Sequence, residues 1–475
     1  MANNNNMNGW DVASLVTIAF VNDAIRTQGS SPPSMQMSTD IMAVKAVFGT
    51  WQITIGGGPD LLIFNLPLVS MAGTISENGR IITQFNYQNL AARVQLVLKF
   101  IDRGAGGHDL VVDSNSPPTS VVSLLDSNGQ PLANSNSLDD AYIKEALTDW
   151  FGTNLSQFNH VFVNLALDPG VDPNAQWAFC KPAVMAYTFV SGTSLANSYL
   201  GLMYNTAGNR NPGATAQVDP SFIPPGCEAA FMLSPAMFLT NFLAPSTATQ
   251  FHIPPPVLLV DTDQMSVSLP PGAQFDLPLV TGSDNNQYRP VLNSLETVVE
   301  NSIITIYATS STLVLDAWYG SVTAHCLSQS WMTLGLDARG QGLVYTSTQP
   351  PINNHTIEQS QGFQILQEIL EIIGIVVLVV STILTDGAVL LVVGALAGIA
   401  EGGLEWALAW FDEQHQNDAP EIDTLVSNLT LPVTWTSSGP FAVSQAGLHQ
   451  GAFFLAGEMR PGASIQTDLR SRFRR

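Results

Sequence analysis

Two acidic pairs are the residues of this sequence whose types and spacing come nearest to a chemical site. Asp261 and Asp263 lie two positions apart, and Asp139 and Asp140 are adjacent. Two carboxylates at such spacing could bind a cation or act as a general acid and base. Because no histidine or glutamate converges on either pair, we interpret both as surface carboxylates and expect no metal site.

The signatures of the common enzyme classes are absent from the sequence. It has no HExxH zinc motif, no GxSxG nucleophile motif, no P-loop and no CxxC. The glycine-rich stretches at 104–107 and 340–342 lack the spacing of a dinucleotide-binding loop, so we expect plain turns there. The three cysteines, which allow at most one disulfide, are Cys180, Cys227 and Cys326. We expect a protein that is not an enzyme and that holds no cofactor.

The longest apolar segment of the chain is residues 363–412. No charged residue occurs in 372–385 or in 387–400, two runs of 14 residues separated only by Asp386. An aspartate followed by glycine favours a turn. The pattern predicts an inserted apolar helical hairpin of two antiparallel legs. Each run is shorter than the roughly 20 residues that span a bilayer, although extension of both legs restores that length.

This hairpin could insert into a membrane, or it could pack on its own protein or in an oligomer interface. The residues expected to contact a membrane are Ile372, Ile375, Val376, Leu378, Val379, Leu390, Leu391 and Val393. In the antiparallel arrangement Glu368 and Glu371 face Glu401 and Glu405. Like charges brought near an apolar medium raise carboxylate pKa values, so we expect these four glutamates to sense pH and to favour membrane contact in acid. If the hairpin does not enter a membrane, we expect the four glutamates to be solvated at its base.

Composition narrows the classes of partner. The formal net charge is −22, with 16 Lys and Arg against 38 Asp and Glu, which argues against a nucleic-acid partner because phosphates require clustered cations. Only 11% of residues are charged, well below the roughly 25% of an average soluble domain. A surface of Ser, Thr, Asn and Gln with short β-branched runs suits a mostly β architecture.

Periodicity predicts one enclosed helix within a β-rich chain. Residues 11–27 are apolar at helical spacing on most of their circumference, so a helix there must be enclosed by other structure. Alternation with period two predicts strands around residues 51–55, 61–69, 94–100, 161–167 and 185–190. Further helices are expected at 138–150 and 232–243. A proline-rich stretch at 253–256 marks the expected boundary between an N-terminal half, 1–252, and a β-rich C-terminal half, 253–475.

Several short motifs occur along the chain, and their order is more specific than any one of them alone. They are Gly9-Trp10-Asp11, Val21-Asn22 with Ile25, Trp51-Gln52-Ile53 with Gly56-Gly57-Gly58 and Pro67, Trp177, Lys181-Pro182 with Tyr187, Phe231-Met232-Leu233-Ser234-Pro235 with Phe238, and Pro432-Val433-Thr434-Trp435. This order resembles the clostridial forty-seven-kilodalton protein family, which is encoded beside neurotoxin genes. The motifs cover most of the chain.

The resemblance implies a fold and a function. The family is similar to the tubular lipid-binding (TULIP) superfamily, so it implies an α+β, TULIP-like fold in which a strongly curved antiparallel sheet wraps a long helix and leaves an apolar groove. The helix expected at 11–27 would take the enclosed position, and its Leu15 and Ile18 would contact lipid. Family members have no assigned enzymatic activity.

Two function hypotheses follow from the sequence. In the first, the protein is a non-enzymatic lipid- or membrane-interacting accessory protein of a toxin-like gene cluster, with lipid or another apolar ligand in its groove. In the second, it is a structural protein whose groove and hairpin bind protein partners from the same cluster. The beginning of the sequence lacks the pattern of a secretory signal. We therefore expect synthesis in the cytoplasm, followed by release or membrane association.

Overall fold

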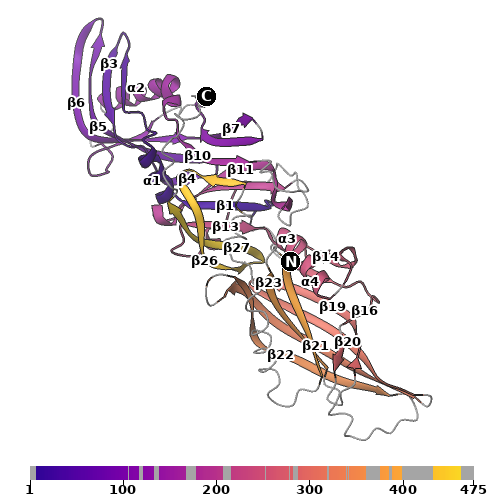
Figure 1. Ribbon diagram of the computed structural model, residues 1–475. Helices are drawn as coiled ribbons and strands as arrows, with labels where there is room; N and C mark the ends of the chain where they lie inside the picture. The colour runs from indigo at the N-terminus through magenta and orange to yellow at the C-terminus, as the bar shows by residue number, and fades with distance from the viewer. Residues whose placement is uncertain are drawn as a thin grey trace, which may run out of the picture.

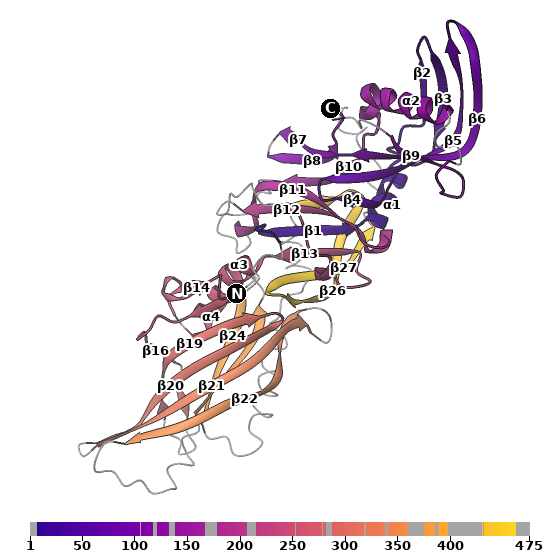
Figure 2. The ribbon, with the colours of Figure 1, turned by 180° about the vertical axis from the view of Figure 1, so that it is seen from behind.

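The computed structural model describes residues 7–461 apart from 105, 117–120, 133–137, 167–177, 207–214, 252, 278, 282–286, 318–319, 338–339, 341, 360–374, 385–387, 398–429 and 431. Figure 1 shows an elongated molecule built mainly from antiparallel sheets that follow one another along its length. Strands β2, β3, β5 and β6 lie at one end, and β19 to β22 lie at the other. The view from behind in Figure 2 shows the same order.

The central sheet has six strands in the order β11-β12-β1-β13-β27-β26. Its strands are β1 (Val12–Thr17), β11 (Pro182–Val190), β12 (Tyr199–Thr206), β13 (Ala229–Leu233), β26 (Ser438–His449) and β27 (Ala452–Pro461). All six residues of β1 are buried, because other strands flank both edges and protein packs on both faces. The first strand of the chain therefore lies inside the central sheet, between β12 and β13.

The helix predicted at 11–27 was wrong in its first part. Residues 12–17 form β1, and helix α1 (Ile18–Gln28) begins only after Thr17, whose hydroxyl accepts a hydrogen bond from the backbone N–H of Phe20 at 3.3 Å. A segment that is apolar on all sides fits a buried helix, but it fits equally a strand that is covered on both faces. The expectation that this segment is enclosed is confirmed.

Beside the central sheet lies a sheet in the order β2-β3-β5-β6-β9, with β4 also paired to β5. Its strands are β2 (Ser34–Ser38), β3 (Met42–Phe48), β4 (Gln52–Gly58), β5 (Leu61–Glu77), β6 (Arg80–Leu96) and β9 (Val121–Leu125). We call the projecting part, made of β2, β3, β5 and β6, the arm. Its inner face is apolar and packs against helix α2 (Leu138–Asn154), which contacts β2, β3 and β9.

A four-stranded sheet in the order β25-β10-β8-β7 connects the arm to the central sheet (Figure 1). Its strands are β7 (Leu98–Gly104), β8 (Gly107–Val112), β10 (Val161–Ala166) and β25 (Val433–Trp435). The strands predicted by period two at 51–55, 61–69, 94–100, 161–167 and 185–190 are confirmed as β4, β5, β6 with β7, β10 and β11, and the helix predicted at 138–150 is confirmed as α2.

The opposite end of the molecule is a nine-stranded sheet. Its strands are β14 (Leu259–Asp261), β15 (Ser266–Ser268), β16 (Phe275–Asp276), β19 (Pro290–Glu300), β20 (Ile303–Ala317), β21 (Gly320–Leu336), β22 (Leu343–Gln359), β23 (Ile375–Leu384) and β24 (Ala388–Ala397). A separate pair consists of β17 (Val280–Thr281) and β18 (Gln287–Tyr288).

Short helices complete the described chain. They are α3 (Pro235–Phe238), the π-helix Leu239–Leu243, α4 (Ala244–Gln250) and the 3₁₀ turns Leu155–Gln157, Ala178–Cys180, Leu195–Asn197, Pro220–Phe222 and Pro255–Val257. The helix predicted at 232–243 therefore begins later than expected, because its first two residues belong to β13.

The predicted helical hairpin was wrong for residues 375–384 and 388–397. These residues form the antiparallel strands β23 and β24, paired from Ile375 with Ala397 to Leu384 with Ala388. The first run is rich in Val and Ile and the second contains three Val, and these branched side chains favour strands. Apolar continuity alone does not separate a strand from a helix. The rest of the predicted insertion, residues 363–374, 385–387 and 398–412, lies outside the described residues.

The expected TULIP-like arrangement is not confirmed. The longest described helix is α2, of 17 residues, and it lies against the arm rather than inside a curved sheet. The described fold is mostly β. The expected division after residue 252 stays a prediction, and the pairing of β25 with β10 and of β27 with β13 joins strands from both expected halves.

Candidate functional site

The structure places Leu15 and Ile18 inside packed protein. Both side chains are fully buried, Leu15 against Gly201 and Met203 of β12 and Ile18 in the main core. A side chain that packs only against protein groups cannot line an open groove. This placement does not support lipid contact at these two residues.

The other predicted site residues belong to the apolar insertion. Ile375, Val376, Leu378 and Val379 lie in β23, and Leu390, Leu391 and Val393 lie in β24. Residue Ile372 and the four glutamates, Glu368, Glu371, Glu401 and Glu405, lie outside the described residues. Membrane contact by this insertion and its pH sensing therefore stay predictions.

The acidic pairs have structural partners. Asp261 accepts hydrogen bonds from the backbone N–H groups of Asp263 and Gln264, each at 2.9 Å, so its carboxylate closes a turn. Asp140 forms an ion pair with Lys144 at 2.8 Å. Within the part of the chain that the structure describes, no cluster of three or more His, Cys, Asp or Glu could hold a metal ion.

One hydroxyl and imidazole pair could in principle act as a nucleophile and base. Ser30 Oγ lies 3.0 Å from His160 Nδ1, but both residues are buried and the hydroxyl also donates to the carbonyl of Ile25. His160 is packed beside Phe158 and Phe162, and burial lowers its pKa from 6.5 to about 4. This pair has no access to substrate, and we assign it a structural role.

An exposed apolar group lies at the end of the arm. Ile41, Ile81 and Ile82 are 44%, 57% and 49% exposed, and we call these three residues the arm tip. Ser76 brings two of them together, because it donates its N–H to the carbonyl of Ile41 at 2.7 Å and pairs with Ile81 on the other side, and Ile82 follows Ile81 in β6. The turn between β5 and β6 uses Asn78 and Gly79 with positive φ, as a tight hairpin requires.

The sheet that carries the arm tip differs in charge from the rest of the chain. Its six strands contain only four charged residues, Lys45, Glu77, Arg80 and Arg93. Three cations against one carboxylate give these strands a charge of +2, whereas the whole chain carries −22. The turns that border the strands add Asp40, Asp60 and Asp126. With these three carboxylates the sheet and its bordering turns have a net charge of −1, a small share of the −22 of the whole chain, so this part of the fold is only weakly repelled by an anionic surface.

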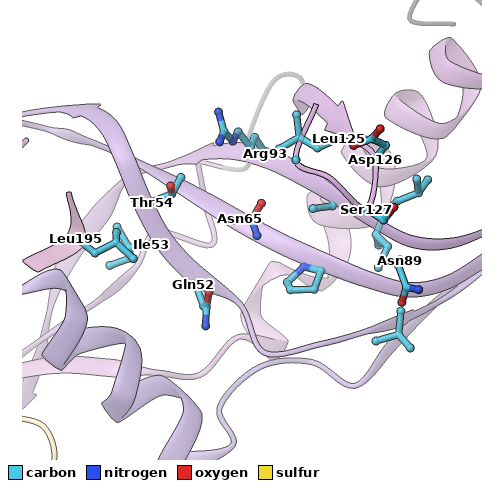
Figure 3. Close-up of a pocket in the computed structure, with 16 residues that line it drawn as sticks. Gln52, Ile53, Thr54, Asn65, Asn89, Arg93, Leu125, Asp126, Ser127 and Leu195 are labelled. Atoms are coloured by element: carbon cyan, nitrogen blue, oxygen red, sulfur yellow. The ribbon is translucent and has the colours of Figure 1, made fainter. Parts of the chain in front are cut away.

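The outer face of the same sheet contains a pocket of about 440 Å³, drawn in Figure 3. It is lined by residues of β4, β5 and β6 and by the turn after β9. Strand β4 is held in place by Asn22 of α1, whose amide exchanges hydrogen bonds of 2.9 and 2.7 Å with the backbone of Ile53. A second pocket, of about 690 Å³, lies nearer the arm tip around Lys45.

A family model described as OrfX-like, Protein OrfX2/OrfX3/P47, matches residues 7–457. The chain belongs to the OrfX-like family. Protein OrfX3 of Paraclostridium bifermentans is 25% identical over 489 residues, which cover 95% of this chain and 97% of that protein. Protein OrfX3 of Clostridium botulinum (strain Kyoto / Type A2) is 22% identical over 497 residues, covering 96% and 98%. The resemblance to the clostridial neurotoxin-cluster family is thus confirmed.

A solved structure of an OrfX-like relative shares the fold. P47 from Clostridium botulinum A2 superposes with a TM-score of 0.66 at 14% identity, covering 95% of this chain and 98% of that one. The family motifs occupy structural positions: Trp10, Trp51 and Trp435 are buried, and the Tyr187 hydroxyl donates to the carbonyl of Asp60 at 2.6 Å. These three tryptophans and this tyrosine therefore support the shared OrfX-like fold.

Neither the arm tip nor the pocket was predicted from the sequence. The arm tip had a usable signal, because Asn78-Gly79 is a strong hairpin turn and two isoleucines follow it at the start of a strand. The pocket had no such signal in the sequence, because its lining depends on which residues stand opposite one another across four strands. In the described part of the chain, no helix is long and apolar enough to cross a bilayer.

Proposed function

We propose that the chain is a non-enzymatic, lipid- or membrane-interacting accessory protein of a toxin-like gene cluster, and that it contacts the membrane through the arm tip. The observation that carries this proposal is the exposure of Ile41, Ile81 and Ile82 at one end of an elongated molecule. None of the three side chains belongs to the buried core. Transfer of an isoleucine side chain to an apolar phase is favourable.

The expected contact is peripheral and reversible. Burying a fully exposed isoleucine contributes about 1.5–3 kcal/mol, so three that are about half exposed contribute on the order of 3 kcal/mol together. That is less than a single acyl anchor supplies, which leaves a role for avidity or for a second contact. Membrane contact by the apolar insertion at 363–412, as expected from the sequence, would supply that second contact.

Charge sets the orientation of the approach. A chain with a net charge of −22 is repelled by an anionic bilayer, but the strands that carry the arm tip and their bordering turns have a net charge of only −1. Repulsion is therefore weakest when the molecule approaches with the arm first. Glu77, Arg80 and Asp40 are the charged residues nearest to the arm tip in sequence, and they nearly cancel one another.

Vesicle flotation tests the proposal. The parent protein should float with phosphatidylcholine vesicles, whereas the triple variant Ile41→Ser, Ile81→Ser, Ile82→Ser should remain at the bottom. A matched control, Tyr307→Ser, Leu327→Ser, Ile352→Ser, removes apolar side chains of similar exposure from the opposite end and should float like the parent. Flotation of the arm-tip variant equal to that of the parent would reject the assignment.

A second candidate function, binding of a protein partner, is favoured by a different surface. Tyr307, Leu327 and Ile352 are 41%, 46% and 47% exposed on three neighbouring strands, β20, β21 and β22. Tyr307 and Ile352 stand on either side of Gln329 in one row, and Leu327 lies two residues away on the same face. Adjacent apolar side chains on an exposed sheet are typical of a protein interface.

The same two variants separate the candidates. If partner binding is the function, cross-linking to a co-expressed protein of the gene cluster should be lost in the Tyr307, Leu327, Ile352 variant and kept in the arm-tip variant. The membrane proposal expects the reverse dependence for flotation. Loss of cross-linking in neither variant would leave the second candidate without its supporting surface.

A further inference from the structure

A row of polar side chains crosses the outer face of the sheet that carries the arm. Gln52 of β4 stands opposite Asn65 of β5, Asn65 opposite Arg93 of β6, and Arg93 opposite Ser123 of β9. Residues directly opposite one another point to the same face, so this row crosses four strands on one side. The residues between them along each strand, such as Phe64 and Val94, are fully buried on the inner face.

Arg93 is the cation of this row, and the described residues offer it no partner. Its Nε atom is buried and makes no hydrogen bond, and within the described ranges its guanidinium forms no ion pair. A guanidinium carries five N–H donors and is always charged. A buried polar atom without a partner in a folded protein requires an explanation, and a bound ligand is one.

The row opens into the pocket of about 440 Å³, which is within the range of sizes that small ligands occupy. Arg93, Asn65 and Thr54 are drawn in Figure 3 on three neighbouring strands around this pocket. At its edge the pairing of β3 with β5 shifts register beside Val69, and Asn89 adopts a positive φ of 55°. Irregular strand geometry of this kind is frequent next to binding sites.

We propose that this pocket binds the carboxylate of a small hydroxylated acid, of the uronic acid class, and that Arg93 is the residue that holds the carboxylate. The fork of a guanidinium matches the two oxygens of a carboxylate, and the remaining lining supplies amides and hydroxyls suited to sugar hydroxyls. Those groups are Gln52, Thr54, Asn65, Asn89 and Ser127. The inference is independent of the membrane proposal, because Ile41, Ile81 and Ile82 do not line this pocket.

A single negative charge is favoured over two. Asp126 also lines the pocket, and its carboxylate accepts hydrogen bonds from the backbone N–H groups of Gln130 at 2.9 Å and Asn128 at 2.8 Å. These two bonds, that from Gln130 first, lower the pKa of Asp126 below its ordinary value, so it is ionised at neutral pH. Because the lining holds one cation and one anion, a bound phosphate dianion would leave two uncompensated negative charges, whereas a bound carboxylate leaves one.

Calorimetric titration of the full chain with D-glucuronate tests the proposal. We expect saturable binding that weakens about tenfold or more in Arg93→Gln, because a charge-assisted pair of hydrogen bonds is lost. Arg93→Lys keeps the charge without the fork and should bind with intermediate affinity. The matched control Lys45→Gln removes the cation of the neighbouring pocket and should bind like the parent.

Ligand controls define the chemistry. D-glucose tests the need for the carboxylate, acetate the need for the hydroxyls, and glycerol 3-phosphate the preference for a monoanion; each should bind more weakly than D-glucuronate. The proposal is overturned by an absence of saturable binding of D-glucuronate, by equal binding in Arg93→Gln, or by tighter binding of glycerol 3-phosphate. Because the Nε atom of Arg93 makes no hydrogen bond within the described chain, Arg93→Gln should melt no lower than the parent, and a large loss of stability would show that Arg93 is structural.

Discussion

The indole N–H of Trp435 donates a hydrogen bond of 3.0 Å to Oγ of Ser14, joining residues 421 positions apart in the chain. Trp435 lies in β25, which pairs with β10, while Ser14 lies in the central strand β1. Both residues are buried. This one bond therefore connects the sheet beside the arm to the central sheet, and it does so with a residue of the family motif near the end of the chain.

Removal of this acceptor should destabilise the whole protein. Ser14→Ala leaves the buried indole N–H of Trp435 without a partner, and a buried unsatisfied donor costs about 1–3 kcal/mol. Urea denaturation measures the loss. Ser34→Ala, on an exposed position of β2, should change the free energy of unfolding by less than about 0.5 kcal/mol. Equal effects of the two substitutions would mean that the Trp435 bond contributes nothing.

The close packing of Leu15 on Gly201 predicts an energetic coupling. A Cβ at Gly201 would collide with the Leu15 side chain and would lie 2.7 Å from Cγ2 of Thr188. We expect Leu15→Ala to cost about 2–5 kcal/mol and Gly201→Ala about 1–3 kcal/mol. The double variant should cost less than their sum by about 0.5–3 kcal/mol, because truncation of the Leu15 side chain makes room for the new Cβ.

The control for this cycle is Gly335→Ala, because no atom lies within 4 Å of a Cβ at that position. Its effect should add to that of Leu15→Ala without coupling. Strict additivity of Gly201→Ala with Leu15→Ala would contradict the packing described for β1 and β12.

His160 predicts a specific loss of stability in acid. Burial lowers its pKa from 6.5 to about 4, so between these values the unfolded chain takes up a proton that the folded chain does not. The free energy of unfolding therefore falls as pH decreases from 6.5 to 4, and between pH 7 and 5 the loss is about 2 kcal/mol. His160→Asn removes the titrating group and keeps a polar atom near Ser30, so its loss over that range should be smaller by the same amount. A parallel pH dependence of parent and variant would contradict the assignment.

Local patterns were sufficient for much of the fold. The alternation of Ile53 and Ile55 with polar residues predicted β4, and the apolar spacing of residues 138–150 predicted α2. Patterns failed where apolar residues leave no polar face. The sequences of β1, β23 and β24 show neither a helical nor a strand period, because nearly all of their residues are apolar. Whether such a segment forms a helix or a strand then depends on the strands that pair with it.

The candidate sites were harder to predict because they depend on placement. Nothing in the sequence shows that Leu15 is packed over Gly201, or that Arg93 stands opposite Asn65 in a pocket. Those relationships arise from strand order and register, which couple positions far apart in the chain. The arm tip could be predicted in part. Its turn is visible in the sequence, but the position of its three isoleucines at the end of the molecule is not.

Site-specific fluorescence tests membrane contact by the arm tip most directly. Cys180, Cys227 and Cys326 are all buried, so an Ile82→Cys variant can be labelled selectively with an environment-sensitive dye. On addition of phosphatidylcholine vesicles, the emission should shift to the blue and should be quenched by nitroxide groups on the lipid acyl chains, whereas a label at Ile352→Cys should show neither change. Unchanged emission from the Ile82→Cys label on vesicle-bound protein, or equal quenching at both positions, would contradict the account.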